Sequence, residues 1–379
     1  PYNTAVGRSA LAANTTGGHN TAVGKDALGT NTTGAQNTAI GRYALQNNQT
    51  ASGNTAMGYA SLISDTTGYD NTAHGQNCLY NNTTGLSNTG IGKNALLTNT
   101  TASQNTAVGS GALYTSTTSD NVALGFNSAY SQTTGSNTLA IGRNALFANT
   151  TGIQNVAVGN YALDAVTTSN YNVGVGYASL SSVTTGERNT GIGRSSGSAL
   201  TTGSYGVFLG YNTRPSGASS DFVTAIGYNV EGAAEYTTIG KSSSDIRALH
   251  GNATWATVSD ERYKKDIEHS TAGLDFVNDL KPRTFNYRNK GDLPTTFAAY
   301  EKDSTETYKN SETNHGFIAQ EVKAAIDAHP DIKNGFRMWD SRDDGSQEVS
   351  EAAVIPILVK AIQELSTEVN ILKEKLNGK

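Results

Sequence analysis

The chain has 379 residues, of which 36% are hydrophobic and 41 are glycine, and its formal net charge is −5. Its single cysteine excludes an intrachain disulfide framework, and neither a signal peptide nor a run of 18 apolar residues is present. No basic footprint points to nucleic acid. Because the chain begins at Pro1 without a methionine, we expect it to be a fragment.

A 17-residue repeat fills the region from residue 3 to residue 240. Its motif is Asn-Thr-Ala-(Val/Ile)-Gly-x-x-Ala-Leu followed by a polar stretch with Thr-Thr, and up to the copy at residue 206 every step is 17 residues except one of 16. A further copy starts at 223 and a degenerate one at 236, where the spacing is broken. This strict period argues against the disorder that so little apolar content would otherwise indicate. Seventeen residues are too few for a helix pair and suit one coil of a parallel β-solenoid or β-roll, with two short strands and two turns. We therefore expect a mostly β rod over 1–210 and degenerate repeats in a neck or tip over 211–258.

Two apolar columns recur at fixed places in the repeat. Two columns this thin cannot form a thick core, so we expect the coils to be stabilised in part by a partner chain. The glycine after the first column suits a sharp bend with positive φ. The first column consists of Val6, Val23, Ile40, Met57, His74, Ile91, Val108, Leu124, Ile141, Val158, Val175 and Ile192. The second consists of Leu11, Leu28, Leu45, Leu62, Leu79, Leu96, Leu113, Ala129, Leu146, Leu163 and Leu180.

The rod offers few candidates for chemistry. Its ten carboxylates show no recurring pair, which argues against a glycosidase site made of two carboxylates. We interpret His74 as an irregularity that faces a neighbour or solvent rather than as a ligand, and Cys78 as a small, partly buried residue at an alanine position. The threonines also allow an ice-binding face, but the variable positions beside them and the turn glycine after them argue against that alternative.

The segment from 259 to 379 has a different composition, with 22 acidic and 17 basic residues, and predicts a separate α+β domain. In chain order we expect a helix capped by Ser270 over 270–281, a strand over 284–288, a polar loop over 289–313, and a strand from 315 that runs into a helix ending before Pro330. The C-terminus, about 350–379, carries an a/d heptad pattern that predicts a coiled coil, and its mixture of Ile, Val and Leu favours a trimer. A helix packed on its own domain is the alternative. The heptad residues are Ile355, Leu358, Ile362, Leu365, Val369, Leu372 and Leu376.

Three motifs in this segment carry a resemblance. They are Ser-Asp-Glu-Arg-Tyr-Lys-Lys-Asp-Ile at 259–267, Leu-Lys-Pro-Arg-Thr-Phe at 280–285 and Gly-Phe-Ile-Ala-Gln-Glu-Val at 316–322. With the terminal heptads, they resemble the intramolecular chaperone domain of phage endosialidase tail spikes. The repeats over 3–240 are similar to the head domain of trimeric autotransporter adhesins, a left-handed parallel β-roll. The first resemblance implies a trimerisation chaperone that cuts itself off at Val258–Ser259, with Ser259 as nucleophile and Lys264 as base.

The predicted dyad has a physical rationale and an alternative. A serine hydroxyl needs a base to act as a nucleophile, and a lysine serves as that base only if desolvation or nearby cations lower its pKa. Arg262 and Lys265 could supply such cations, and Asp260 is a further supporting candidate. From spacing alone, however, Ser259 reads as a helix N-cap with Asp260 in the first turn and Lys264 as a solvated side chain. Lys265 is the alternative base.

Two residues of the third motif, Gln320 and Glu321, are expected to hold the fold rather than to take part in cleavage.

The sequence therefore predicts a segment of a phage tail fibre or tail spike. We expect a homotrimeric structural rod that binds a host receptor, either a glycan or an outer-membrane component, and a removable chaperone. The expected location is the virion, after assembly in the host cytoplasm. Self-cleavage is the only enzymatic activity expected, with no metal, cofactor, nucleic acid or membrane insertion. The alternatives are a bacterial trimeric surface adhesin and a polysaccharide-degrading tail spike.

Overall fold

The computed structural model describes residues 2–242, 244–251, 259, 261–330, 332, 336, 338–342 and 344–377. These residues belong to two compact units, Pro1–Ser259 and Asp260–Lys379.

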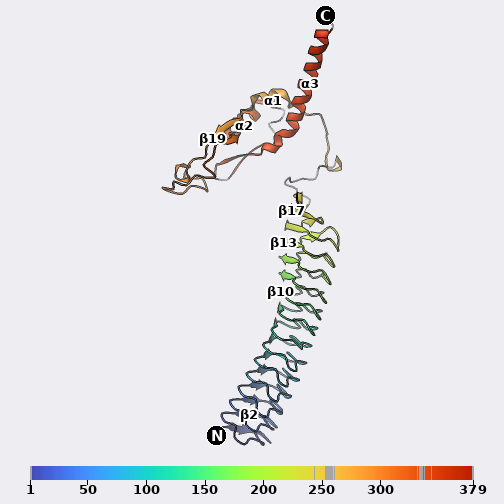
Figure 1. Cartoon of the computed structure of the whole chain (residues 1–379), viewed down its shortest axis with the longest axis vertical. Coiled ribbons are helices and arrows are strands. Elements are labelled where there is room, and N and C mark those ends of the chain that lie inside the picture. The colour runs from blue at the N-terminus through green and yellow to red at the C-terminus, as the bar shows by residue number, and fades with distance from the viewer. Residues whose placement is uncertain are drawn as a thin grey trace. The chain divides into compact units, whose positions relative to one another are not determined.

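The first unit is a parallel β-solenoid of about 14 turns with a 17-residue repeat. Successive strands pair in register, so that Thr4 lies beside Thr21 and Ala5 beside Ala22, and the strands stack in one column (Figure 1). The stacked strands are β1 (Thr4–Val6), β2 (Thr21–Val23), β3 (Thr38–Ile40), β4 (Thr55–Met57), β5 (Thr72–His74), β6 (Thr89–Ile91), β7 (Thr106–Val108), β8 (Val122–Leu124), β9 (Leu139–Ile141), β10 (Val156–Val158), β11 (Val173–Val175), β12 (Thr190–Ile192), β13 (Val207–Tyr211), β15 (Thr224–Tyr228) and β17 (Tyr236–Lys241).

Parallel stacking ends at β17, which pairs antiparallel with β18 (Ser244–Leu249). A second short ladder joins β14 (Arg214–Pro215) to β16 (Glu231–Gly232), and the Arg214 side chain pairs with Glu231 across it at 3.1 Å.

Each coil up to β12 contributes one three-residue strand, so the prediction of two strands per coil was wrong. The rest of the coil is turns, because several of its residues adopt left-handed backbone conformations that no strand accommodates. The second-column leucines are among these residues, with φ of 47° at Leu28 and 49° at Leu45. Their amides still bond to the next coil: Leu28 N donates to Ala44 O at 3.0 Å.

The core of each coil is formed by the strand alanines and the second-column leucines, such as Ala39, Leu45, Ala56 and Leu62, all 0% exposed. The first column does not belong to this core. Neighbouring residues of a strand face opposite sides, and the narrow interior takes the alanine, so the Val/Ile residue beside it points outward; Ile192, for example, is 46% exposed.

A buried asparagine precedes each strand from β2 to β8 and links three coils. Asn71 Nδ2 donates to Gly85 O at 2.8 Å, its amide donates to Asn54 Oδ1 at 2.8 Å, and its own Oδ1 accepts the Asn88 amide at 3.0 Å. The structure also confirms the glycine bend. Gly142 has φ of 131°, and a Cβ placed there would lie 2.5 Å from the Gly159 carbonyl of the next coil.

The second unit is small and mixed. Its helices are α1 (Leu274–Asp279), α2 (Ala319–Ala328) and α3 (Ile355–Asn377), with 3₁₀ turns η1 at Glu261–Tyr263, η2 at Lys290–Asp292 and η3 at Glu351–Val354. Its strands pair as antiparallel hairpins, β19 (Arg283–Phe285) with β20 (Asn314–Gly316) and β21 (Trp339–Ser341) with β22 (Gln347–Val349). The core gathers Phe276, Val322, Ile326, Met338 and Ile357.

Helix α1 is shorter than predicted and is not capped by Ser270. Its N-cap is Gly273, and the amide of Leu274 donates to Oε2 of Glu364 on α3 at 2.7 Å. A side chain 90 residues away therefore supplies the cap, which local sequence signals cannot reveal. No helix in the described ranges has the length and apolar content needed to cross a membrane.

Candidate functional site

The segment that carries the predicted dyad is exposed. Ser259 and Lys264 are both exposed, and between them the chain makes the single 3₁₀ turn η1, closed by the Lys264 amide donating to Glu261 O at 2.8 Å. Val258 and Asp260 lie outside the described residues. Ser259 and Lys264 also belong to different compact units, so their pairing stays a prediction.

Exposure matters for the predicted chemistry. A lysine acts as a base at neutral pH where burial or neighbouring cations lower its pKa. Arg262 and Lys265, the predicted supporting cations, are exposed as well. The described chain therefore keeps all four of these residues exposed, and burial of the predicted dyad stays a prediction.

The second and third motifs meet at an ion pair. Strand β19 brings Arg283 to the start of α2, where its guanidinium donates to Glu321 through Nε at 3.0 Å and Nη2 at 2.7 Å. These hydrogen bonds hold the pKa of Glu321 below its usual range. Glu321 thus connects the hairpin to the helix, in agreement with the structural role expected for it. The sequence could not reveal the partner, because Arg283 lies 38 positions away.

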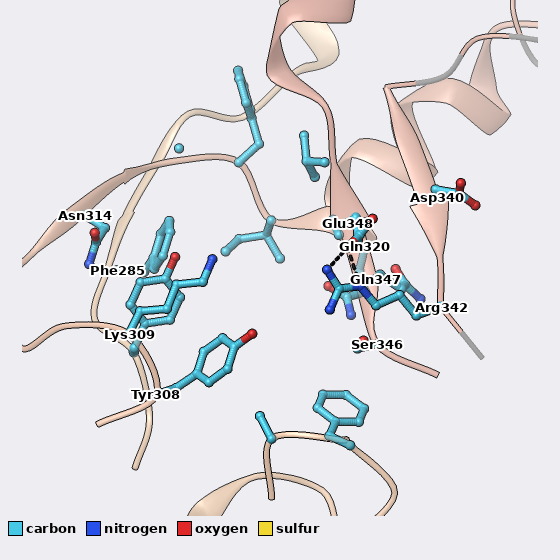
Figure 2. A pocket seen from close by; sticks show the side chains of 18 of the residues that line it. Phe285, Tyr308, Lys309, Asn314, Gln320, Asp340, Arg342, Ser346, Gln347 and Glu348 are labelled. Atoms are coloured by element: carbon cyan, nitrogen blue, oxygen red, sulfur yellow. Dashed lines mark hydrogen bonds and ion pairs between the residues drawn. The ribbon is translucent and has the colours of Figure 1, made fainter. Parts of the chain in front are cut away.

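A cavity of about 1040 Å³ opens beside this junction, and its wall includes Gln320. Figure 2 shows Tyr308 and Lys309 on one side and Arg342, which pairs with Glu348, on the other. The ammonium of Lys309 lies 5.6 Å from the Tyr308 ring centroid. One wall is therefore aromatic and cationic, and the other is ionic.

The wall also includes Asp344, which is held as an acceptor. Its carboxylate accepts the amide of Ala298 at 2.9 Å and the hydroxyl of Ser346 at 2.6 Å, and these bonds lower its pKa to about 2. A carboxyl group with so low a pKa does not act as a general acid near neutral pH. Among the described residues, no cluster of His, Cys, Asp and Glu could hold a metal ion.

Helix α3 has one face that packs on its own unit and another that carries the exposed heptad residues. Ile357 and Ala361 are buried against the rest of the unit, at 5% and 3% exposure. The predicted heptad residues lie on other parts of the surface and all are exposed, from 38% at Leu358 to 80% at Leu376. The helix therefore packs on its own unit and still leaves an apolar seam uncovered.

Comparison with known families identifies part of this unit. Residues 259–329 match the family model described as chaperone of endosialidase (Peptidase_S74). The matched segment begins at Ser259, spans 71 of the 379 residues and includes all three sequence motifs. Together with the β-solenoid before it, the match supports an endosialidase-type chaperone domain in this part of the chain. No curated protein and no solved structure matches the chain.

Proposed function

We propose that this chain is a segment of a phage tail fibre or tail spike. Its solenoid serves as a structural, receptor-binding rod, and its C-terminal chaperone drives trimerisation and then separates itself at Val258–Ser259. The observation that carries this proposal is the chaperone match over 259–329, which directly follows a β-solenoid.

Exposed apolar surfaces in both units support an assembly of several chains. On the rod, the outward column stacks Ile40 on Met57, at 37% and 40% exposure, and continues through His74 to Ile91, at 39%. In the chaperone unit, the heptad seam of α3 is exposed along the helix. Contiguous apolar surface of this kind marks protein interfaces, and heptad seams of Ile, Val and Leu bury themselves in coiled coils.

The proposed cleavage is an intramolecular acyl transfer followed by hydrolysis. Oγ of Ser259 attacks the carbonyl carbon of Val258 while Lys264 takes the hydroxyl proton, and the C–N bond then breaks as the Ser259 nitrogen gains a proton. Water hydrolyses the resulting ester, leaving a carboxylate on Val258 and a free hydroxyl and amine on Ser259. Because Lys264 is exposed in the single chain, trimer assembly is proposed to bury the dyad and so switch cleavage on.

Intact-mass spectrometry of the full chain tests the cleavage. The wild type is expected to yield two products, 1–258 and 259–379, whereas Ser259→Ala and Lys264→Met stay intact. Lys302→Met is the matched control, because it removes an exposed lysine outside the three motifs, and it should be cut like the wild type. Cleavage of Ser259→Ala at the same bond, or an uncut wild-type trimer, would contradict the mechanism.

Native mass spectrometry tests the coupling to assembly. Ser259→Ala is expected to form a stable, uncut trimer. The double variant Ile362→Asp with Leu365→Asp changes two exposed seam residues and is expected to remain monomeric and uncut. Monomers that cleave as fast as the wild type, or a Ser259→Ala chain that forms no trimer, would show that assembly does not control cleavage.

A further inference from the structure

Exposed aromatic residues gather in one part of the rod. Ten Tyr or Phe side chains are strongly exposed among the described residues of the first unit, and six of them lie between residues 171 and 228. The six are Tyr171, Tyr177, Tyr205, Tyr211, Phe222 and Tyr228, at 42–53% exposure. Such a concentration of exposed apolar rings is unusual for a surface without a binding role.

The first of two ladders formed by these rings, ladder A, consists of Arg143, Tyr161, Tyr177, Arg194, Tyr211 and Tyr228. The guanidinium of Arg194 lies 5.7 Å from the ring centroids of both Tyr177 and Tyr211. Tyr211 in turn stacks on Tyr228 at 5.2 Å. Arg143 lies over Tyr161, which meets Tyr177 edge to face at 5.9 Å. The contacts therefore run without a break across six successive coils.

The second ladder, ladder B, consists of Tyr171, Arg188, Tyr205 and Phe222, each two positions before a strand. Arg188 lies 5.1 Å from the Tyr171 ring and 5.5 Å from the Tyr205 ring, and Tyr205 stacks on Phe222 at 4.8 Å. Both ladders thus alternate planar cations with aromatic faces along the rod.

The coil itself does not require these residues. At the ladder A position after the glycine bend, other coils carry Gln76 or Ser110, and in the coil of Tyr161 this position is Asn160, so that the ring stands one residue later. At the ladder B position, all four residues have left-handed φ between 54° and 62°. Asn137 fills the same place elsewhere, and asparagine tolerates this conformation better than bulky residues do. Bulky rings held in an unfavourable conformation and left in solvent indicate a function at the surface.

Ladder A also has charge that is not neutralised. No carboxylate of the described residues forms an ion pair with Arg143 or Arg194, whose guanidinium carbons lie 5.7 Å from tyrosine ring centroids. In ladder B, by contrast, Nη1 of Arg188 lies 3.4 Å from Oε2 of Glu187. Seven of the ten Lys and Arg residues in 1–258 follow the bend glycine: Arg8, Lys25, Arg42, Lys93, Arg143, Arg194 and Lys241. A guanidinium group beside an aromatic ring can still bind a carboxylate through two of its N–H groups.

We infer that ladder A binds a linear, carboxylate-bearing polysaccharide that lies along the rod; ladder B, whose arginine already pairs with Glu187, offers aromatic faces only. Aromatic faces pack against the apolar C–H faces of sugar rings, and the arginines between them pair with the carboxylates. Coils follow one another at roughly 4.8 Å, a spacing comparable to one sugar ring in an extended chain. This inference rests on the proposed receptor-binding function and names the class of ligand and the region that binds it.

Binding of the full chain to polygalacturonate tests the inference, with the fully methyl-esterified polymer as the uncharged comparison. We expect the wild type to bind polygalacturonate at least tenfold more tightly than its ester. Tyr177→Ala with Tyr211→Ala should lose at least tenfold in affinity. Arg194→Lys keeps the charge but loses the flat contact with two rings, and it should lose severalfold. Tyr59→Ala is the matched control, because Tyr59 occupies the ladder A position in a coil far from the ladder, and it should bind like the wild type.

Other outcomes overturn the inference. Equal affinity for both polymers would show that the arginines do not recognise carboxylates. Unchanged affinity in the ladder variants would show that the ladders are not the binding site. If the ladder variants no longer trimerise in native mass spectrometry while Tyr59→Ala does, the ladders are contacts between subunits instead. Self-cleavage and trimer mass are measured in the same samples, so that failure of this inference can be told apart from failure of the proposed function. A cleaved trimer that binds neither polymer refutes this inference and leaves the proposed function standing.

Discussion

Asp65 breaks a buried asparagine ladder and offers a sharp test of the solenoid core. Coils on either side place Asn14, Asn31, Asn48, Asn82 and Asn99 at the same position. In this ladder the side-chain amide of one asparagine donates to the side-chain oxygen of the preceding coil, as Asn99 Nδ2 does to Asn82 Oδ1 at 2.9 Å. Asp65 accepts from Asn82 at 2.9 Å and is 0% exposed. Burial raises its pKa to about 8, although Asn82 and the Gly68 amide donate to it.

The sign of the pH effect follows from that pKa. The folded chain holds the Asp65 proton more tightly than the unfolded chain, whose pKa is near 3.8. Stability is therefore present in full below about pH 4 and falls as pH rises toward 8. The pKa of Asp65 in the folded chain exceeds that in the unfolded chain by roughly 4, which corresponds to at most about 5–6 kcal/mol in the free energy of unfolding. Local relaxation and water entry reduce this figure, so we expect a loss of about 3–5 kcal/mol across the window.

Asp65→Asn is expected to remove this dependence. Asparagine carries no charge and can donate to Asn48 as its ladder neighbours do, so the variant should exceed the wild type at pH 8 by about 3–5 kcal/mol. Hydrogen exchange of the Leu62 and Leu79 amides, which bond to the following coils, reports the local free energy of opening once the intrinsic rate at each pH is divided out. Such a local measure is needed because a solenoid need not unfold in one step.

A matched control and a clear refutation are available in the same coil. Asp70 is exposed, and Asp70→Asn should leave the pH dependence unchanged. Wild-type protection of Leu62 and Leu79 that stays constant from pH 5 to pH 8 would show that Asp65 is not held protonated in the core. Equal protection of the wild type and Asp65→Asn at pH 8 would lead to the same conclusion.

Two further predictions concern packing and hydrogen bonding in the core. A Cβ at Gly90 would lie 2.5 Å from Sγ of Cys78, so Gly90→Ala should lower the free energy of unfolding of the purified chain by about 1–3 kcal/mol. The loss should be smaller in a Cys78→Ala background, where the sulfur is gone. Equal losses in both backgrounds would show that the clash with Cys78 is not the cause. Asn71→Ala leaves the Gly85 carbonyl and the Asn88 amide without their buried partner and should cost about 2–4 kcal/mol. Thr84→Ala, at an exposed turn position, is the control. Hydrogen exchange of amides in the same coils measures the loss of stability in both variants. A similar loss in the two variants would mean that the asparagine column does not hold the coils together.

Repeat period and composition were sufficient to predict the solenoid, because in-register stacking follows directly from 17-residue identity. Which side chains fill the interior of the coil was harder to predict. The sequence shows two apolar columns without indicating which of them fills the core. The coil is so narrow that Ala39 and Ala56 fill the space beside the leucines, and Ile40 and Met57 face outward. The left-handed conformation of Leu28 was also missed, since leucine carries no sequence signal for positive φ.

In the chaperone unit, local patterns located the elements, and long-range contacts decided their ends. Periodicity predicted α3 because seven apolar residues recur over its length, and those residues are exposed as a seam. The start of α1 was misplaced because its cap is Glu364, far along the chain. Cys78 was expected to be partly buried and is fully buried, where burial raises its pKa to about 12. The His74 interpretation agrees with its partial exposure in the outward column.

The regularity of the rod explains why a chaperone is useful for the proposed trimer. Strands such as Thr4–Val6, Thr21–Val23 and Thr106–Val108 have the same sequence, Thr-Ala-Val. A neighbouring chain shifted by one coil would meet almost the same outward surface, so the rod alone discriminates poorly between registers. Only local irregularities, including the 16-residue step before Asn121, oppose such a shift. The heptad seam of α3 occurs once per chain. If the chains pair through this seam before their rods meet, the rods start to stack in one register only. A chaperone that fixes register is needed only until the coils have stacked, which gives its proposed removal at Val258–Ser259 a physical reason.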